Sequence, residues 1–131
     1  SHYPAKYRPR LALTDKGCPM VSQTLAQEIS VMEADLCSAF ADPTRILMLY
    51  ALNENPRNVG ELANDLQVSQ SAASRHLKVL RDRGLVIAER QGMNIEYRLA
   101  DPRLIEALDL LRQIMRDRIV HRASLMEVAA P

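Results

Sequence analysis

The fold of this chain is decided by residues 58–84, which read NVGELANDLQVSQSAASRHLKVLRDRG. Asn58 is followed three residues later by Glu61, a capping signature that predicts a short helix ending near Leu66. Ser69 has the side chain preferred at the start of a helix and predicts a second helix after it. Two short helices joined by about three residues form a helix-turn-helix.

The residues after this pair of helices predict a β-hairpin. Gly84 supplies the left-handed residue that ends the second helix at Arg83. Beyond it, the apolar period drops to two in residues 85–90 and 95–99, which flank turn-forming residues at 91–94. A helix-turn-helix followed directly by a short hairpin is a winged helix, so the expected fold is mainly α with a small β-hairpin.

Three further helices are expected around this unit. Asp42-Pro43 and Asp101-Pro102 each combine an N-cap with a proline in the first turn. The helix after Asp42 is apolar nearly all round, so we expect Ile46, Leu47, Leu49 and Leu52 to be buried. The first and last helices each carry one apolar stripe, formed by Leu25, Ile29, Met32, Leu36 and Phe40 and by Leu104, Leu108, Leu111, Met115 and Ile119. These two stripes need a partner surface.

The 131 residues divide into one domain and two flanking segments. Prolines and glycine interrupt residues 1–20, which we expect to form a flexible N-terminal arm. Residues 21–120 form the winged helix-turn-helix domain with dimerisation helices at both ends, and residues 121–131 a C-terminal tail. An aromatic content of 4% favours a helical core over a large β-sandwich.

Composition and motifs exclude several classes of function. The longest apolar run, Ile46 to Leu52, is far below the roughly 20 residues of a membrane span, and no secretory signal is recognisable, so we expect a cytoplasmic protein. Ser74 and His76 are two apart on a helix and face different directions. Without a glycine-rich phosphate loop or a metal-ligand cluster, we expect no catalytic residue, no metal and no cofactor.

The second helix of the pair carries the pattern of a DNA-reading helix. Residues 69–98 contain six basic and three acidic side chains, although the whole chain has a net charge of only +1. A helix that enters the major groove of double-stranded DNA needs small or polar residues in its first turns. The candidate DNA-binding residues are Gln70, Ser71, Ser74, Arg75, His76, Lys78 and Arg81, with Arg90, Gln91 and Asn94 on the hairpin. The alternatives are an ordinary solvated surface and a winged-helix scaffold that binds protein.

Several motifs resemble the ArsR/SmtB family of bacterial winged-helix repressors. They are residues 40–45 (FADPTR), 61–63 (ELA), 69–80 (SQSAASRHLKVL) and 84–86 (GLV), and the resemblance covers about residues 36–111. It implies a homodimeric transcriptional repressor, released from its operator by an inducer, that dimerises through its first and last helices. The interface residues expected on this basis are Leu25, Ile29, Met32, Leu36, Leu108, Leu111 and Met115.

The inducer is unknown from the sequence. The positions that match the family's cysteine metal site are Asn58, Gly60 and Ala63, and those that match its last-helix site are Asp101, Arg103, Ile114 and Asp117. The first set lacks the cysteines of an arsenic, lead or cadmium site. The second set has one carboxylate at each end and no imidazole, so it cannot hold zinc tetrahedrally. Cys18 and Cys37 are the candidate inducer-sensing residues, through oxidation, reactive sulfur or an arsenical. The alternatives are a packing role for Cys37 and a metal, haem or other ligand site that the sequence does not reveal.

Overall fold

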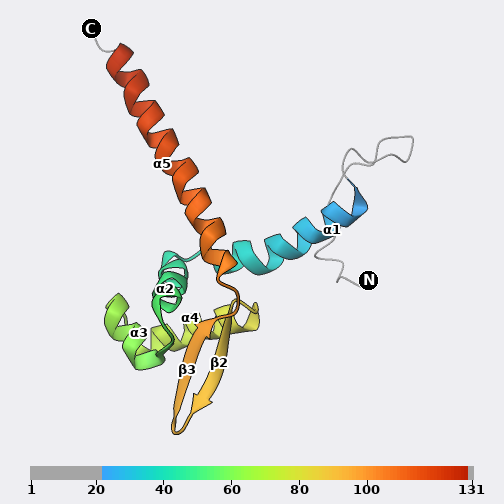
Figure 1. The fold of residues 1–131 in the computed structure, drawn as a ribbon, viewed down its shortest axis with the longest axis vertical. Coiled ribbons are helices and arrows are strands. Elements are labelled where there is room, and N and C mark those ends of the chain that lie inside the picture. The colour runs from blue at the N-terminus through green and yellow to red at the C-terminus, as the bar shows by residue number, and fades with distance from the viewer. Residues whose placement is uncertain (1–21, 130–131) are drawn as a thin grey trace.

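The computed structural model describes residues 22–129 and has the mainly α architecture with a small antiparallel sheet expected from the sequence (Figure 1). The expected arm at residues 1–20, Cys18 included, lies outside the described residues. The elements in chain order are α1 (Gln23–Met32), the π-helical turn η2 (Glu33–Cys37), α2 (Pro43–Glu54), β1 (Arg57–Asn58), α3 (Val59–Leu66), α4 (Gln70–Asp82), β2 (Val86–Gln91), β3 (Asn94–Leu99) and α5 (Arg103–Ala129).

The helix-turn-helix of α3 and α4 is confirmed, together with the local signals that begin and end its helices. Asn58 Oδ1 accepts a hydrogen bond from the Glu61 N–H at 2.8 Å, and Glu61 Oε1 accepts one from the Asn58 N–H at 3.1 Å. Ser69 Oγ accepts a hydrogen bond from the Ala72 N–H at 3.1 Å and so caps α4. Gly84 has a φ of +75°, in the left-handed region that a residue with a Cβ rarely adopts.

The hairpin is also confirmed, but the sheet has a third strand. Strands β2 and β3 pair antiparallel, with Val86 opposite Leu99 at the base and Gln91 opposite Asn94 at the tip. The two-residue strand β1 pairs with the other edge of β3, where Arg57 lies opposite Tyr97. We expected Arg57 to belong to a loop. Two residues are too few to show a strand period, and they pair only because β3 lies beside them.

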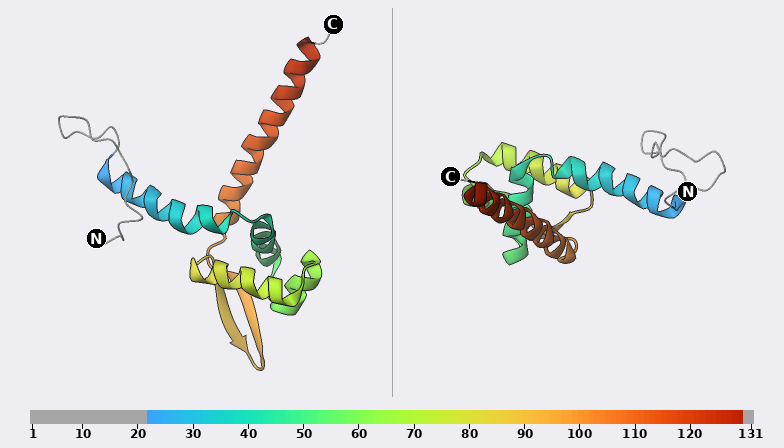
Figure 2. Two further views of the ribbon diagram at one scale, coloured as in Figure 1. Left: turned by 180° about the vertical axis from the view of Figure 1, so that it is seen from behind. Right: turned by 90° about the horizontal axis from the view of Figure 1, so that it is seen from above.

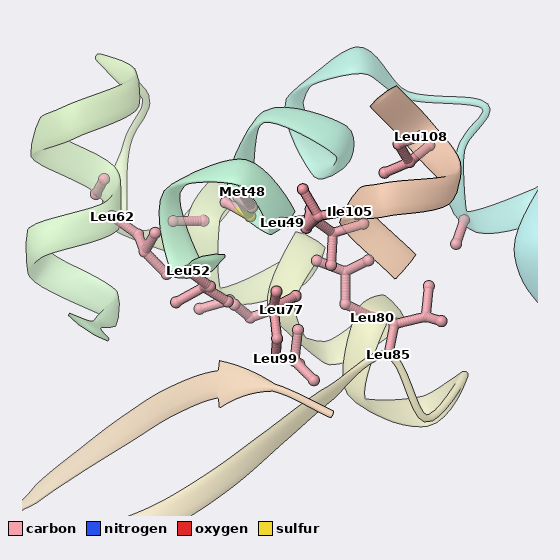
Figure 3. Close-up of a cluster of buried hydrophobic side chains, with 14 residues drawn as sticks. Met48, Leu49, Leu52, Leu62, Leu77, Leu80, Leu85, Leu99, Ile105 and Leu108 are labelled. Carbon is pink, nitrogen blue, oxygen red and sulfur yellow. The ribbon is translucent and has the colours of Figure 1, made fainter. Parts of the chain in front are cut away.

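The core lies where α2, α3 and α4 meet the base of the hairpin and the start of α5 (Figure 3). Its largest fully buried side chains are Met48, Leu49, Leu62, Leu77 and Leu80. The expectation that Leu47 is buried with the rest of α2 is wrong, because this side chain is 55% exposed on a side of the helix that no other described element covers.

Helix α5 has an anchored first part and a long projecting part (Figures 1 and 2). Ile105 and Leu108 are buried in the core, and Tyr50 on α2 donates a hydrogen bond to Asp109 Oδ1 at 2.6 Å. Leu108, expected at the dimer interface, therefore packs inside the single chain. The helix continues to Ala129, so residues 121–129, expected as part of a tail, are helical.

Helix α1 leaves the core in a different direction from α5 (Figure 2), and its apolar stripe is exposed. Leu25, Ile29 and Met32 are 45%, 50% and 48% exposed, whereas Leu36 packs partly against the core. On α5, Leu111 and Met115 are 56% and 53% exposed. Both expected dimerisation helices thus present large apolar side chains that the described part of the chain does not cover. None of the helices within residues 22–129 has the length and hydropathy needed to cross a bilayer.

Candidate nucleic-acid interface

Helix α4 has one buried face and one polar, exposed face. Ala73, Leu77 and Leu80 are completely buried against α2 and α3. Spacings of four and three residues place these three on one side of a helix with 3.6 residues per turn. The residues exposed on the remaining surface of α4 are Gln70, Ser71, Ser74, Arg75, Lys78, Arg81 and Asp82. Packing of the apolar face therefore turns six of the seven helix residues predicted to bind DNA towards solvent.

His76 is the exception among those seven residues. Its side chain is only 20% exposed and lies against the first turn of α2, with Nδ1 3.3 Å from Arg45 Nη1 and Nε2 3.7 Å from Asp42 Oδ2. His76 is three residues after Ala73 and four before Leu80, so its position on the edge of the buried face could have been read from the spacing. His76, also a candidate DNA-binding residue, thus lies at the edge of the buried face and not on the exposed face of α4.

The basic side chains of residues 69–98 fall into two groups. Three of them form ion pairs within the chain: Lys78 with Asp82 at 2.8 Å, Arg98 with Glu89 at 2.8 Å, and Arg83 with Asp35 at 3.5 Å. The hydrogen bond from Lys78 is the main reason why the pKa of Asp82 lies below its usual value. Arg75, Arg81 and Arg90 form no ion pair with another described residue. These three arginines are therefore the side chains best placed to offer free positive charge to an anionic partner.

The hairpin forms a wing that projects from the core on the side opposite α5 (Figures 1 and 2). Arg90, Gln91 and Asn94 are exposed at its distal end, with Gly92 at a φ of +64° in the turn. The exposed face of α4 is polar, the wing tip carries Arg90, Gln91 and Asn94 beside the exposed Met93 and Ile95, and the apolar stripes of α1 and α5 lie on other elements. This separation allows one surface to bind DNA and another to bind protein.

Among the described residues, Cys37 is the one candidate inducer-sensing side chain. Cys37 is exposed on η2. Residues 22–129 contain no group of three or more His, Cys, Asp or Glu side chains arranged to hold a metal ion.

Comparison with known proteins places this architecture in a family. Residues 42–88 match the family model described as bacterial regulatory protein, arsR family. Over 103 residues the chain is 38% identical to the HTH-type transcriptional repressor SmtB of Mycobacterium tuberculosis, an alignment that covers 78% of this chain and 76% of SmtB. The chain belongs to the ArsR family.

Two solved structures resemble this one. The crystal structure of Rv0081 from Mycobacterium tuberculosis superposes with a TM-score of 0.66 at 33% identity, covering 72% of this chain and 96% of Rv0081. The homodimeric winged helix-turn-helix DNA-binding domain of a possible ArsR-family regulator from Mycobacterium bovis superposes with a TM-score of 0.66 at 25% identity, covering 78% of this chain and 94% of that domain. This ArsR-family chain is therefore a transcriptional regulator of the winged helix-turn-helix type.

Proposed function

We propose that this ArsR-family regulator is a homodimeric repressor that binds double-stranded operator DNA and is released by an inducer. The observation that carries the proposal is the exposed polar and basic face of α4, opposite a face buried in the core. In a helix-turn-helix protein the second helix enters the major groove, where side chains at its N-terminal end reach base edges. Gln70, Ser71, Ser74 and Arg75 occupy those first turns of α4.

The remaining candidates suit contacts with the DNA backbone. Lys78 and Arg81 lie further along α4, where they are placed to bind phosphates. Arg90, Gln91 and Asn94 on the wing are placed to contact the adjacent backbone or the minor groove. Base contacts supply sequence preference and phosphate contacts supply salt-dependent affinity, so the two groups make different contributions.

A binding experiment separates these contributions. The DNA is a duplex selected by the wild-type protein from a randomised pool, and affinity is measured over a salt series. Arg75→Ala should weaken binding by about 1–3 kcal/mol and relax sequence preference at one position of each half-site. Lys78→Ala should weaken binding to all DNA sequences alike, and it should reduce the slope of log affinity against log salt concentration by about 1.

Arg116→Ala is the matched control, since Arg116 is an exposed arginine on the projecting part of α5 and its removal changes net charge by the same amount. The control should bind as the wild type does. Affinity that is indifferent to salt, or wild-type binding by both α4 variants, would contradict DNA binding through α4 and favour a protein-binding scaffold.

The dimer is supported by the exposed apolar side chains of α1 and α5. Leu25, Ile29 and Met32 on one helix and Leu111 and Met115 on the other are about half exposed in the single chain. Large contiguous apolar surface of this kind marks a protein interface. A second copy of the chain offers the same two surfaces, and a two-fold axis would place the recognition helices of both protomers on one side of the DNA.

For release from DNA, we propose a thiol-based bridge between Cys18 of one protomer and Cys37 of the other. Helix α1 continues into η2 without a break as far as Cys37. A helix rises about 1.5 Å per residue, so Cys37 lies about 21 Å from the start of α1 at Gln23, whereas the five residues back to Cys18 span at most about 18 Å. A disulfide needs Cα atoms within about 7 Å, so a bridge within one chain would require these five residues to run almost fully extended back along the helix. Antiparallel crossing of the two first helices would bring Cys18 towards Cys37 of the other protomer.

Non-reducing electrophoresis after mild oxidation tests this bridge, alongside operator binding. A covalent dimer that is lost in both Cys18→Ser and Cys37→Ser, and that binds DNA more weakly than the reduced protein, is the expected result. An oxidised protein that runs as a monomer and binds operator fully would leave the inducer to be sought among metals, haem and other ligands.

A further inference from the structure

The last turns of the first helix are connected to the middle and to the C-terminal end of the recognition helix α4. The π-helical turn η2 occupies residues Glu33–Cys37 and is followed by Ser38 and Ala39. π-helical turns within α-helices are rare and occur often at functional positions. Two arginines, Arg45 and Arg83, connect this region with α4.

Arg45 joins the end of the first helix to the middle of α4. Its Nε donates a hydrogen bond to the Ala39 carbonyl at 2.7 Å and its Nη2 donates one to the Ser38 carbonyl at 3.1 Å. Its Nη1 lies 3.3 Å from His76 Nδ1. A guanidinium has only donors, so His76 Nδ1 must accept this bond and the ring proton must sit on Nε2, the nitrogen that faces Asp42. One side chain thus binds two carbonyls of the first helix and one ring of the recognition helix.

Arg83 makes the second connection, at the other end of α4. It is the residue that caps the C-terminus of α4, and its Nη1 lies 3.5 Å from Asp35 Oδ1 in η2. Both side chains also line an open hollow with Met32 and Leu36. The pair is partly exposed, with side-chain exposures of 35% and 43%, so it contributes little to the stability of the fold. It joins the C-terminal end of α4 to η2.

We propose that Arg45 and the Arg83–Asp35 pair are positioning residues that hold the recognition helix in register with the dimerisation helix α1. The proposal rests on the proposed function, in which α1 forms part of the dimer interface and α4 reads DNA. The apolar face of α4 packs in the same core as Ala39, against which Leu36 and Phe40 also pack, and the polar contacts of Arg45 and Arg83 add directed connections between α4 and the end of the first helix. In the dimer, these polar contacts therefore help to set the separation of the two recognition helices.

The property that these residues control is the preferred spacing between DNA half-sites. Dimeric helix-turn-helix proteins bind half-sites about one helical turn of DNA apart, so the separation of their recognition helices selects the spacing. A rigid connection between α1 and α4 makes the protein intolerant of a changed spacing. A loosened connection lets α4 shift to fit a changed spacing, which reduces the discrimination between half-site spacings.

Charge reversal of the Arg83–Asp35 pair provides the test. The probes are the duplex selected by the wild-type protein and the same duplex with one base pair inserted between its half-sites. The measured quantity is the ratio of the two dissociation constants. Because both duplexes offer nearly the same phosphates, a change in protein charge alone leaves this ratio unaltered.

We expect the insertion to weaken wild-type binding by about tenfold or more, and Asp35→Arg or Arg83→Asp to reduce that ratio at least about threefold. The double variant with both reversals should restore the wild-type ratio to within about twofold, because the ion pair forms again with its charges exchanged. Arg45→Lys should also reduce the ratio, because a lysine cannot donate to two carbonyls and a ring nitrogen in the same fixed geometry. The control is Arg103→Asp, which makes the same charge change as Arg83→Asp at an exposed residue in the first turn of α5.

Folding and dimerisation are checked for each variant by circular dichroism and sedimentation. Asp35→Asn is the milder substitution that replaces Asp35→Arg in the comparison if the reversal unfolds the chain. Folded single variants that keep the wild-type ratio, or a double variant that does not regain it, would overturn the positioning role while leaving DNA binding through α4 intact. A wild-type protein that binds no DNA, or that is indifferent to Arg75→Ala and Lys78→Ala, would instead overturn the proposed function and this inference with it.

Discussion

Substitution of Leu111 by aspartate separates dimerisation from folding. Leu111 is 56% exposed on the projecting part of α5, so a carboxylate there meets water in the single chain and leaves the core untouched. In the proposed dimer the same position is covered by the partner. Leu111→Asp should therefore yield a folded monomer.

The size of the effect follows from the exposure. Full burial of a leucine side chain contributes about 2 kcal/mol, so covering the exposed half of Leu111 contributes about 1 kcal/mol in each protomer. An unpaired carboxylate buried at the interface costs a further 3 kcal/mol or so. These two contributions add to about 4 kcal/mol in each protomer, or about 8 kcal/mol for the two symmetric copies, and raise the dimer dissociation constant more than about a hundred-thousandfold, since each 1.4 kcal/mol is a factor of ten.

Sedimentation velocity at micromolar concentration measures this change, and circular dichroism confirms that the helices are retained. The matched control is Gln113→Asp, which introduces the same charge two residues later, about 200° around the helix from Leu111. The control should remain a dimer. A Leu111→Asp protein that sediments as the wild-type dimer, or a wild-type protein that is itself a folded monomer at this concentration, would refute the assignment of α5 to the interface.

Three further substitutions test the fold that presents α4. Leu77→Ala removes a completely buried side chain and should lower the free energy of unfolding in urea by about 2–5 kcal/mol. Asn58→Ala removes the capping box of α3 and should lower the same quantity by about 1 kcal/mol. Tyr50→Phe removes the hydroxyl that holds the pKa of Asp109 below its usual value of 3.8. The pKa of Asp109 is lower in the folded state than in the unfolded state, so the stability gained from the Tyr50–Asp109 hydrogen bond is complete above pH 3.8 and disappears as the pH falls through the folded pKa. The difference in Tm between Tyr50→Phe and wild type should therefore be present at pH 7 and vanish in acid.

The sequence by itself determined the helix-turn-helix and the wing. Asn58 with Glu61, Ser69 and Gly84 act on backbone groups within three or four residues of themselves, so their effect does not depend on the rest of the fold. The buried face of α4 follows in the same way from the spacing of its apolar residues. The family resemblance, carried by the same stretches, is confirmed by the comparisons.

The tertiary structure decided which apolar residues the single chain can cover and which polar residues meet. Leu108 and Leu111 belong to one stripe in the sequence, yet Leu108 is buried and Leu111 is half exposed because α5 touches the core only at its beginning. Arg45 and His76 are 31 residues apart, and Arg83 and Asp35 are 48 apart. No local spacing links residues so distant, because such contacts form only after the apolar faces of several helices have packed and fixed where each polar side chain points.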